Sequence, residues 1–183
     1  MEFAKFFIIL FFFMFGCDDD PGEIKNKGEI TLSSEFQGSD NYYYRYGYSF
    51  EKAKFFVVLP VYENEIPDVF LEDIPIPGSE SLASFIYSEA SNLNGIIKNG
   101  DFNNLNEAET FYNAYDNAVS GPWSSLSDTI ESFQVYTFKT SVNNYVKLLV
   151  LDVRLFDNLT TPDYMEIDLR YFIQRDGTIN LAE

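Results

Sequence analysis

The chain contains no histidine and only one cysteine, Cys17, among its 183 residues. Without histidine, the Ser-His-Asp and Cys-His nucleophile systems are excluded. No remaining side chain has an ordinary pKa near neutrality that would suit it as a general base. The usual zinc sites, which are built from cysteine and histidine, are excluded as well. The sequence therefore predicts no metal site and none of the commonest forms of acid–base catalysis.

Basic residues are scarce: 12 Lys and Arg stand against 29 Asp and Glu, for a net charge of −17 at pH 7. Nucleic-acid binding depends on Lys and Arg that neutralise phosphates, so we expect no nucleic-acid partner. The acidity does not indicate disorder, because 18% of the residues are aromatic and disordered chains are poor in aromatics. We expect a folded domain with a sizeable hydrophobic core.

No apolar run is long enough to span a bilayer as a helix, which takes about 20 residues. The run Phe6 to Phe15 has instead the length of a signal-peptide core, and Lys5 gives it a positively charged start. Met14-Phe15-Gly16-Cys17 resembles the lipobox of bacterial lipoproteins. We therefore predict a signal peptide over 1–16 and lipid attachment at Cys17. The alternative is an ordinary secretory signal with an incidental cysteine.

The residues after Cys17 predict a tether. The segment 17–28 is polar and acidic and contains proline and glycine, as flexible linkers do. Its Asp18-Asp19-Asp20 run resembles a surface-export signal of one group of Gram-negative bacteria; the alternative is a solvated linker. We expect a protein that is anchored by lipid in the bacterial outer membrane and faces outward. A single domain is expected over 29–183.

Strand patterns dominate this domain. Period-two alternation and short apolar runs predict strands at 30–36, 42–50, 54–59, 133–140, 145–156, 164–174 and 178–181. The turn pair Asp176-Gly177 precedes the last of them and predicts a hairpin. Four prolines between residues 60 and 78 argue against a central strand there.

Helical spacing appears in the middle of the chain. A helix is predicted over 82–93, with Ser79 as its N-cap, and a second over 108–119. Asn104 with Glu107, or Asn106 with Glu109, would cap the start of the second helix. Strands, then helices, then strands predict a mainly β domain, an antiparallel β-sandwich-like fold with a one- or two-helix insertion at about 79–120.

Aromatic residues are the candidate ligand-binding residues. Tyrosines occupy alternate positions of the strand 42–50, namely Tyr42, Tyr44, Tyr46 and Tyr48. Such a face is either core or a stacking platform for a sugar or a porphyrin. Trp123 has the same two interpretations, as a binding residue on a loop or as a cover over the core.

Carboxylates offer the only plain route to catalysis. Glu166 and Asp168 share one face of the strand 164–174. At this spacing their backbones lie about 7 Å apart, which suits the acid pair of a glycosidase. The alternative is a solvent-facing polar stripe in which Arg170 pairs with its neighbours.

Three segments near the C-terminus form a recognisable series: Gln134 to Thr140, Asn144 to Val150, and Gln174-Arg175-Asp176-Gly177-Thr178. The series is similar to the HmuY-like haem-binding lipoproteins of Gram-negative bacteria. In that family a strand ending in Thr, a Tyr-x-Lys strand and a final Gln-x-Asp-Gly-Ser/Thr turn follow one another. The resemblance covers about 133–181. It implies an all-β fold, haem capture at the cell surface and an outer-membrane receptor as partner.

The sequence departs from the family at the ligands of the haem iron. The founding member uses histidines, and this chain has none. Some relatives use Met, but the only Met after the signal peptide is Met165, on the apolar face of its strand. Tyr can ligate ferric haem, yet no tyrosine here matches a family ligand position. Three hypotheses follow: a noncatalytic binding lipoprotein for haem or another porphyrin, a glycan- or glycoprotein-binding surface module, and a carboxylate-based hydrolase.

Overall fold

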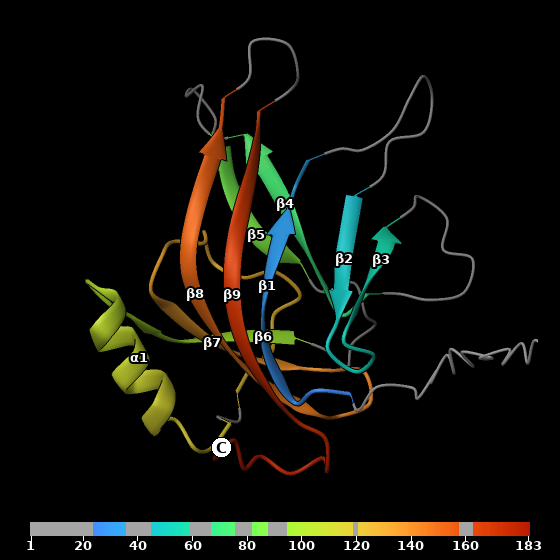
Figure 1. The fold of residues 1–183 in the computed structure, drawn as a ribbon, viewed down its shortest axis with the longest axis vertical. Coiled ribbons are helices and arrows are strands. Elements are labelled where there is room, and N and C mark those ends of the chain that lie inside the picture. The colour runs from blue at the N-terminus through green and yellow to red at the C-terminus, as the bar shows by residue number, and fades with distance from the viewer. Residues whose placement is uncertain are drawn as a thin grey trace, which may run out of the picture.

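Two antiparallel sheets and one helix make up the domain (Figure 1). The computed structural model describes residues 24–35, 45–58, 67–75, 82–87, 95–118, 121–157 and 163–183. The predicted signal peptide, Cys17 and most of the predicted tether lie outside the described residues. The mainly β, sandwich-like fold with a helix insertion, as predicted, is confirmed.

The larger sheet has five strands in the order β1-β9-β8-β7-β6. Their bounds are Lys27–Ser33 for β1, Gly95–Asp101 for β6, Gln134–Lys139 for β7, Tyr145–Phe156 for β8 and Tyr164–Gln174 for β9. Strand β8 lies at the centre, and all five residues from Val146 to Val150 are buried. The continuous apolar run in this part of the sequence is explained by cover on both faces of the sheet.

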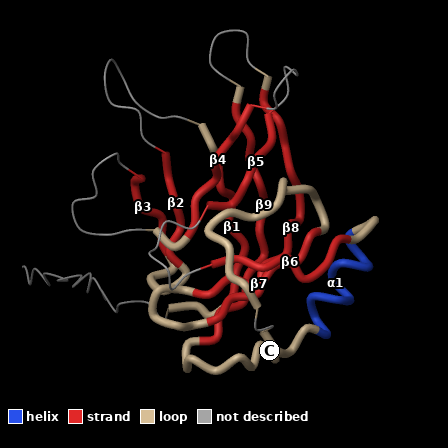
Figure 2. The backbone as a smooth tube through the Cα atoms, turned by 180° about the vertical axis from the view of Figure 1, so that it is seen from behind, coloured by secondary structure: helices blue, strands red, loops and turns tan. Residues whose placement is uncertain are grey.

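The smaller sheet has four strands in the order β3-β2-β4-β5. Their bounds are Arg45–Ser49 for β2, Lys54–Val58 for β3, Val69–Pro75 for β4 and Leu82–Tyr87 for β5. Figures 1 and 2 show this sheet lying across the face of the larger one. The core fills the space between the sheets, and it includes Leu32, Phe50, Leu71, Phe138 and Leu169.

Helix α1, Leu105–Ala114, covers the outer face of the five-stranded sheet. Asn104 caps its start by accepting a hydrogen bond from the backbone N–H of Glu107, so the first of the two predicted caps is correct. Ala108 and Tyr112 face inward and pack with Val135 and Leu149 in a second, smaller core. The helix ends at Ala114, five residues before the predicted end.

The helix predicted over 82–93 is wrong, because residues 82–87 form β5. Its spacing Leu82, Phe85, Ile86 also fits a short strand, and the segment pairs with β4 along six residues. A run this short does not distinguish the two periods, and the available strand partner decides. Strand β6 was missed, because Gly95, Asn99 and Gly100 weaken its strand signal.

Two further expectations need correction. Strand β4 lies between β2 and β5, although a central strand was not expected among the prolines. Pro67 precedes it and Pro75 is its last residue, so neither missing N–H interrupts the ladder. No strand forms over 178–181; this segment makes only an isolated bridge between Asn180 and Asn117. Within the described residues, no helix has the length and hydropathy needed to cross a membrane.

Candidate functional site

The tyrosine face of β2 divides between the core and the surface. Tyr48 is buried, and its hydroxyl shares a 2.9 Å hydrogen bond with the hydroxyl of Tyr171 on the opposite sheet. Tyr46, two residues earlier on the same side, is 43% exposed. Tyr42 and Tyr44 lie outside the described residues. The structure therefore places Tyr48 in the core and leaves Tyr46 as a described surface tyrosine.

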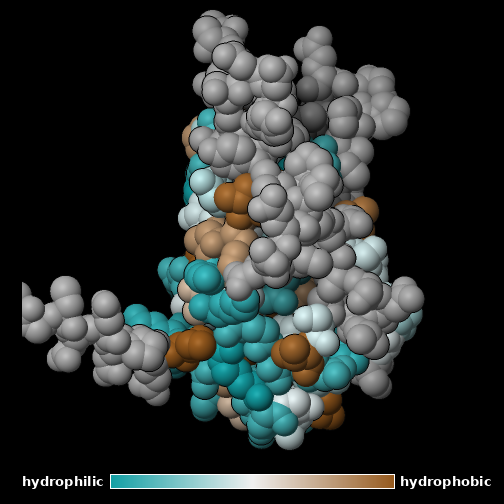
Figure 3. Space-filling model, turned by 90° about the vertical axis from the view of Figure 1, so that its right-hand side faces the viewer, coloured by the Kyte–Doolittle hydropathy of each residue, from teal (hydrophilic) through white to brown (hydrophobic). Residues whose placement is uncertain are grey.

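Tyr46 belongs to an exposed apolar surface on the β2–β3 hairpin, which we call the hairpin patch and define as Tyr46, Phe55 and Val57. Phe55 is 45% and Val57 36% exposed. Val57 lies directly opposite Tyr46, and Phe55 directly opposite Tyr48, so all three point to one side of the sheet. Strand β3 is the edge strand of its sheet. Figure 3 shows one side of the molecule, where tan and brown apolar atoms lie among hydrophilic ones.

Sequence reasoning missed Phe55 and Val57. The signal was present, because period two over 54–59 puts them on one face. What was needed in addition was the register of the hairpin, which brings that face beside the tyrosines.

The hairpin carries positive charge in a strongly acidic chain. Residues 45–58 contain Arg45, Lys52 and Lys54 but only one acid, Glu51. Lys52 and Lys54 lie over the ring of Phe56, with their Nζ atoms 5.3 and 4.6 Å from its centroid. Arg45 donates to the Glu72 carboxylate at 2.6 Å. The hairpin therefore has a net positive charge, whereas the chain as a whole is negative and repels anions.

The buried carboxylate of Asp68 accepts hydrogen bonds from the turn of this hairpin. Its Oδ2 accepts hydrogen bonds from Ser49 Oγ at 3.0 Å, Phe50 N–H at 2.7 Å and Glu51 N–H at 3.4 Å. Burial raises the pKa of the Asp68 carboxyl, and the three donors oppose that rise. These three hydrogen bonds stabilise the turn that connects the two strands of the hairpin patch.

Trp123 lies elsewhere. It is partly buried, and its ring centroid is 6.1 Å from that of Tyr145 on β8. A Cβ at Gly95 would clash with it, so its backbone crosses close to β6. Trp123 therefore packs against the five-stranded sheet, whereas Tyr46 lies on the four-stranded one. The structure does not bring these two predicted site residues together.

Glu166 and Asp168 share the outer face of β9, as predicted. Both of their carboxylates pair with Arg154 of β8. Its guanidinium lies 3.2 Å from Glu166 Oε2 and donates to Asp168 Oδ1 at 3.0 Å. The hydrogen bond from Arg154 lowers the pKa of Asp168. A glycosidase acid needs a raised pKa, so the geometry supports an ion-pair cluster. Arg170 does not join it; it binds Glu29 and Glu109 instead.

No group of three or more His, Cys, Asp or Glu side chains within the described ranges could hold a metal ion. Met165 packs against the core between the sheets. Its backbone N–H donates to Ser34 Oγ at 2.8 Å, and its carbonyl accepts from Ser34 N–H at 2.9 Å. Met165 is therefore a partly buried strand residue.

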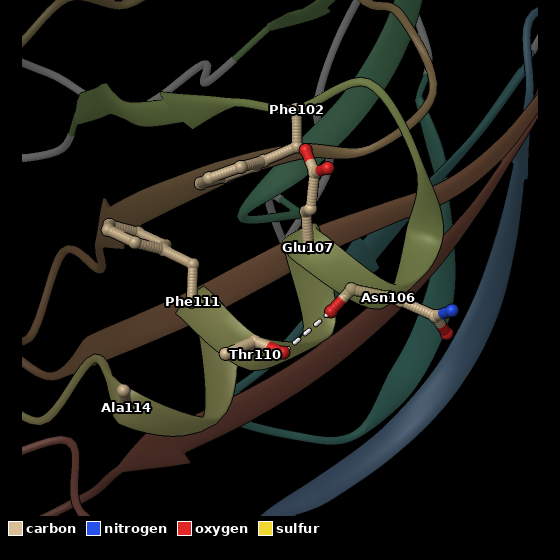
Figure 4. Close-up of a pocket in the computed structure, with 6 residues that line it drawn as sticks. All are labelled: Phe102, Asn106, Glu107, Thr110, Phe111 and Ala114. Carbon is tan, nitrogen blue, oxygen red and sulfur yellow. Dashed lines mark hydrogen bonds between the residues drawn. The ribbon is translucent and has the colours of Figure 1, made fainter.

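A wide, open groove of about 640 Å³ runs along α1 (Figure 4). Its lining residues are Phe102, Asn106, Glu107, Thr110, Phe111 and Ala114. The rings of Phe102 and Phe111 lie 5.0 Å apart and pack against the small core beneath the helix. Thr110 donates to the Asn106 carbonyl and Glu107 accepts from Asn104, so the helix itself uses these polar groups. Packing of α1 explains the groove without a ligand.

The residues that carry the family resemblance meet at one end of the sandwich. Arg175 donates to the carbonyls of Phe50 at 2.7 Å and Glu51 at 2.9 Å. The Glu51 carboxylate accepts from Thr140 Oγ1 and Asn144 Nδ2, and Gly177 N–H donates to Asn144 Oδ1. This motif cluster joins three turns of the two sheets, so its observed role is structural. No protein-family model matches the sequence, and no curated protein matches it either.

Proposed function

We propose that the chain is a noncatalytic binding lipoprotein of the bacterial outer membrane, held by lipid on Cys17 and facing outward. Its proposed ligand is haem or another porphyrin, taken up at the hairpin patch and passed to an outer-membrane receptor. The lipobox-like Met14-Phe15-Gly16-Cys17 and the acidic run after it support the anchor. The resemblance of residues 133–181 to HmuY-like proteins supports the ligand class.

The observation that carries the ligand proposal is the exposure of Tyr46 beside Phe55 and Val57. A porphyrin is a flat apolar disc, and flat apolar side chains stack on such a face. The Tyr46 hydroxyl supplies an oxygen of the kind that ligates ferric haem iron. Lys52 and Lys54 lie over the ring of Phe56, on the opposite face of β3, so the ligand proposal depends on the apolar patch and the Tyr46 hydroxyl.

Titration with haemin tests the proposal. The full-length protein is purified in a non-ionic detergent, with protein-free detergent as the blank, and the Soret band is followed. We expect a saturable Soret shift that Phe55→Ala weakens and that Tyr46→Phe alters in position. Tyr164→Phe, a tyrosine stacked on Phe156 at 4.8 Å, is the matched control and should change nothing.

Binding of iron-free protoporphyrin separates stacking on the porphyrin ring from ligation of the iron. Tyr46→Phe keeps the ring and should leave protoporphyrin binding intact while changing the haemin spectrum. The absence of a saturable Soret shift up to high micromolar haemin would refute the haem proposal. A glycan array then tests the alternative ligand class at the same patch, with Tyr46→Ala as the variant that should lose the signal.

A further inference from the structure

The point where the predicted tether enters the domain is fastened to the turn of the β2–β3 hairpin. Asn26, the residue before β1, accepts hydrogen bonds from Ile173 N–H at 2.7 Å and from Arg175 Nε at 2.9 Å. The same guanidinium donates to the carbonyls of Phe50 and Glu51 in the hairpin turn. Figure 1 shows β1 beginning near this turn. One arginine therefore holds the end of the tether beside the hairpin.

Positive charge gathers at this end of the sandwich, although the chain as a whole has a net charge of −17. Lys52 and Lys54 on the hairpin are exposed, as are Lys25 and Lys27 at the start of β1. Together with Arg175 they form a surface that we call the basic end. A concentration of one sign of charge attracts a partner of the opposite sign.

The described carboxylates that contact the basic end do not balance it. Glu51 lies 3.3 Å from Arg175, and Glu183 lies 3.2 Å from Lys27. Glu183 also pairs with the buried Lys147 at 3.3 Å, so it serves two cations. Among the residues that the structure describes, the basic end therefore keeps a net positive charge.

The predicted tether carries the complementary charge. Residues 17–23, which lie outside the described part of the chain, contain no Lys or Arg, and their acids are Asp18, Asp19, Asp20 and Glu23. An extended chain spans at most about 3.6 Å per residue, so Asp20, six residues before Asn26, lies within about 22 Å of it. Lys52 follows Glu51, whose carbonyl binds the same arginine as Asn26, so it is within reach. A link this short gives an effective concentration on the order of millimolar.

We infer that the acidic run Asp18-Asp19-Asp20 docks on the basic end, with its carboxylates against Lys52 and Lys54. Both ammonium groups lie over the ring of Phe56. Each ammonium has three donors, so contact with the ring leaves donors for a carboxylate. Anionic headgroups are the other possible occupant, but they would have to approach against the repulsion of the tether acids.

Docking leaves the hairpin patch open, because Phe56 lies on the face of β3 opposite to Phe55 and Val57. It also gives the domain an orientation. Under the lipid anchor proposed above, on which this consequence rests, a docked tether holds the hairpin turn toward the membrane.

Zero-length cross-linking with a carbodiimide, which joins a carboxylate to an amine in contact with it, tests the docking. On the full-length protein in a non-ionic detergent at low salt, mass spectrometry should find cross-links from the acidic run to Lys52 and Lys54. Their yield should fall about threefold or more near 1 M NaCl, where the Debye length is about 3 Å. Lys98 and Asp128, 2.9 Å apart elsewhere in the domain, show that the coupling works. This experiment needs no lipid on Cys17, so failure of the docking and failure of the anchor are distinguishable.

Two variants of Lys52 provide the matched comparison, read out at Lys54, which stays reactive in both. Lys52→Glu should lower the yield of tether cross-links to Lys54 about threefold, because it removes positive charge from the basic end. Lys52→Arg keeps that charge and should retain the wild-type yield. Both positions are exposed, and the melting temperatures should match.

Three results would overturn the inference. The first is that no cross-link joins the acidic run to Lys52 or Lys54 while Lys98 and Asp128 couple. The second is an equal yield at Lys54 in Lys52→Glu and Lys52→Arg. The third is that cross-links found in phosphatidylcholine vesicles disappear in vesicles that also contain phosphatidylglycerol, which would assign the basic end to anionic headgroups.

Discussion

The hydroxyls of Tyr48 and Tyr171 meet 2.9 Å apart in the interior and join the two sheets of the sandwich. Their ring centroids lie 5.7 Å apart, and Phe50 packs against both rings. Burial raises the pKa of Tyr48, as does its hydrogen bond to Tyr171. Tyr48 therefore stays a neutral phenol and acts as a structural bridge between the sheets.

Removing both of these hydroxyls should cost less than the sum of the two single removals. Tyr48→Phe leaves the Tyr171 hydroxyl buried without its partner, which we expect to lower the free energy of unfolding by about 1–3 kcal/mol. In the double variant Tyr48→Phe/Tyr171→Phe neither hydroxyl remains, so its loss should be smaller than the sum of the two single losses by about 1 kcal/mol. Urea denaturation of the four proteins measures this coupling. Simple additivity would show that the hydrogen bond contributes nothing.

Arg175 should prove structural rather than ligand-binding. Its guanidinium donates to two backbone carbonyls and lies 3.3 Å from the Glu51 carboxylate. Arg175→Ala should lower the free energy of unfolding by about 2 kcal/mol, because it removes hydrogen bonds to a charged donor and leaves Glu51 without its cation. Lys27→Ala, which removes an exposed ion pair with Glu183, should cost at most about 1 kcal/mol. Equal midpoints for the two variants would contradict this assignment.

The fold was largely predictable from periodicity, and particular residues explain where it was not. Alternation over 164–174 and the continuous run in β8 gave the right strands, because long patterned segments have a single good solution. Leu82–Tyr87 is too short for its spacing to distinguish a strand from a helix. Its outcome depended on β4, a partner thirteen residues earlier whose presence the flanking prolines concealed.

The candidate site was predictable only in part. Tyr46 was identified from alternation, but the same pattern included Tyr48, and nothing local separates the two. Which of them is buried depends on which one the opposite sheet covers. Tyr48 is covered and hydrogen-bonds to Tyr171, whereas Tyr46 is exposed. Tyr112 and Lys147 were read as ordinary helix and strand positions, because their shared environment forms only when α1 packs on β8.

The Arg154 cluster should make stability depend on acid pH. The pKa of Asp168 is lowered in the folded protein, so its ionised form contributes stability above its ordinary pKa of about 3.9. That contribution should disappear as the pH falls through the lower folded-state pKa. The variant Asp168→Asn lacks this contribution to stability at every pH. The stability difference between wild type and Asp168→Asn should therefore be largest near neutrality and shrink below about pH 4.

Urea midpoints measured across this pH range provide the check, with exposed Asp157→Asn as the control. A difference between wild type and Asp168→Asn that grows as the pH falls would mean that the pKa of Asp168 is raised, and the residue would again qualify as a catalytic acid.

Every proposal about where this protein works depends on Cys17. Growth of cells with labelled palmitate, followed by membrane fractionation and protease treatment of intact cells, tests it for wild type and Cys17→Ala in parallel. The wild-type protein should carry the label, sediment with the outer membrane and be digested from outside. Cys17→Ala should carry no label and leave the membrane fraction. Retention of Cys17→Ala in the outer membrane at the wild-type level would contradict the lipid anchor.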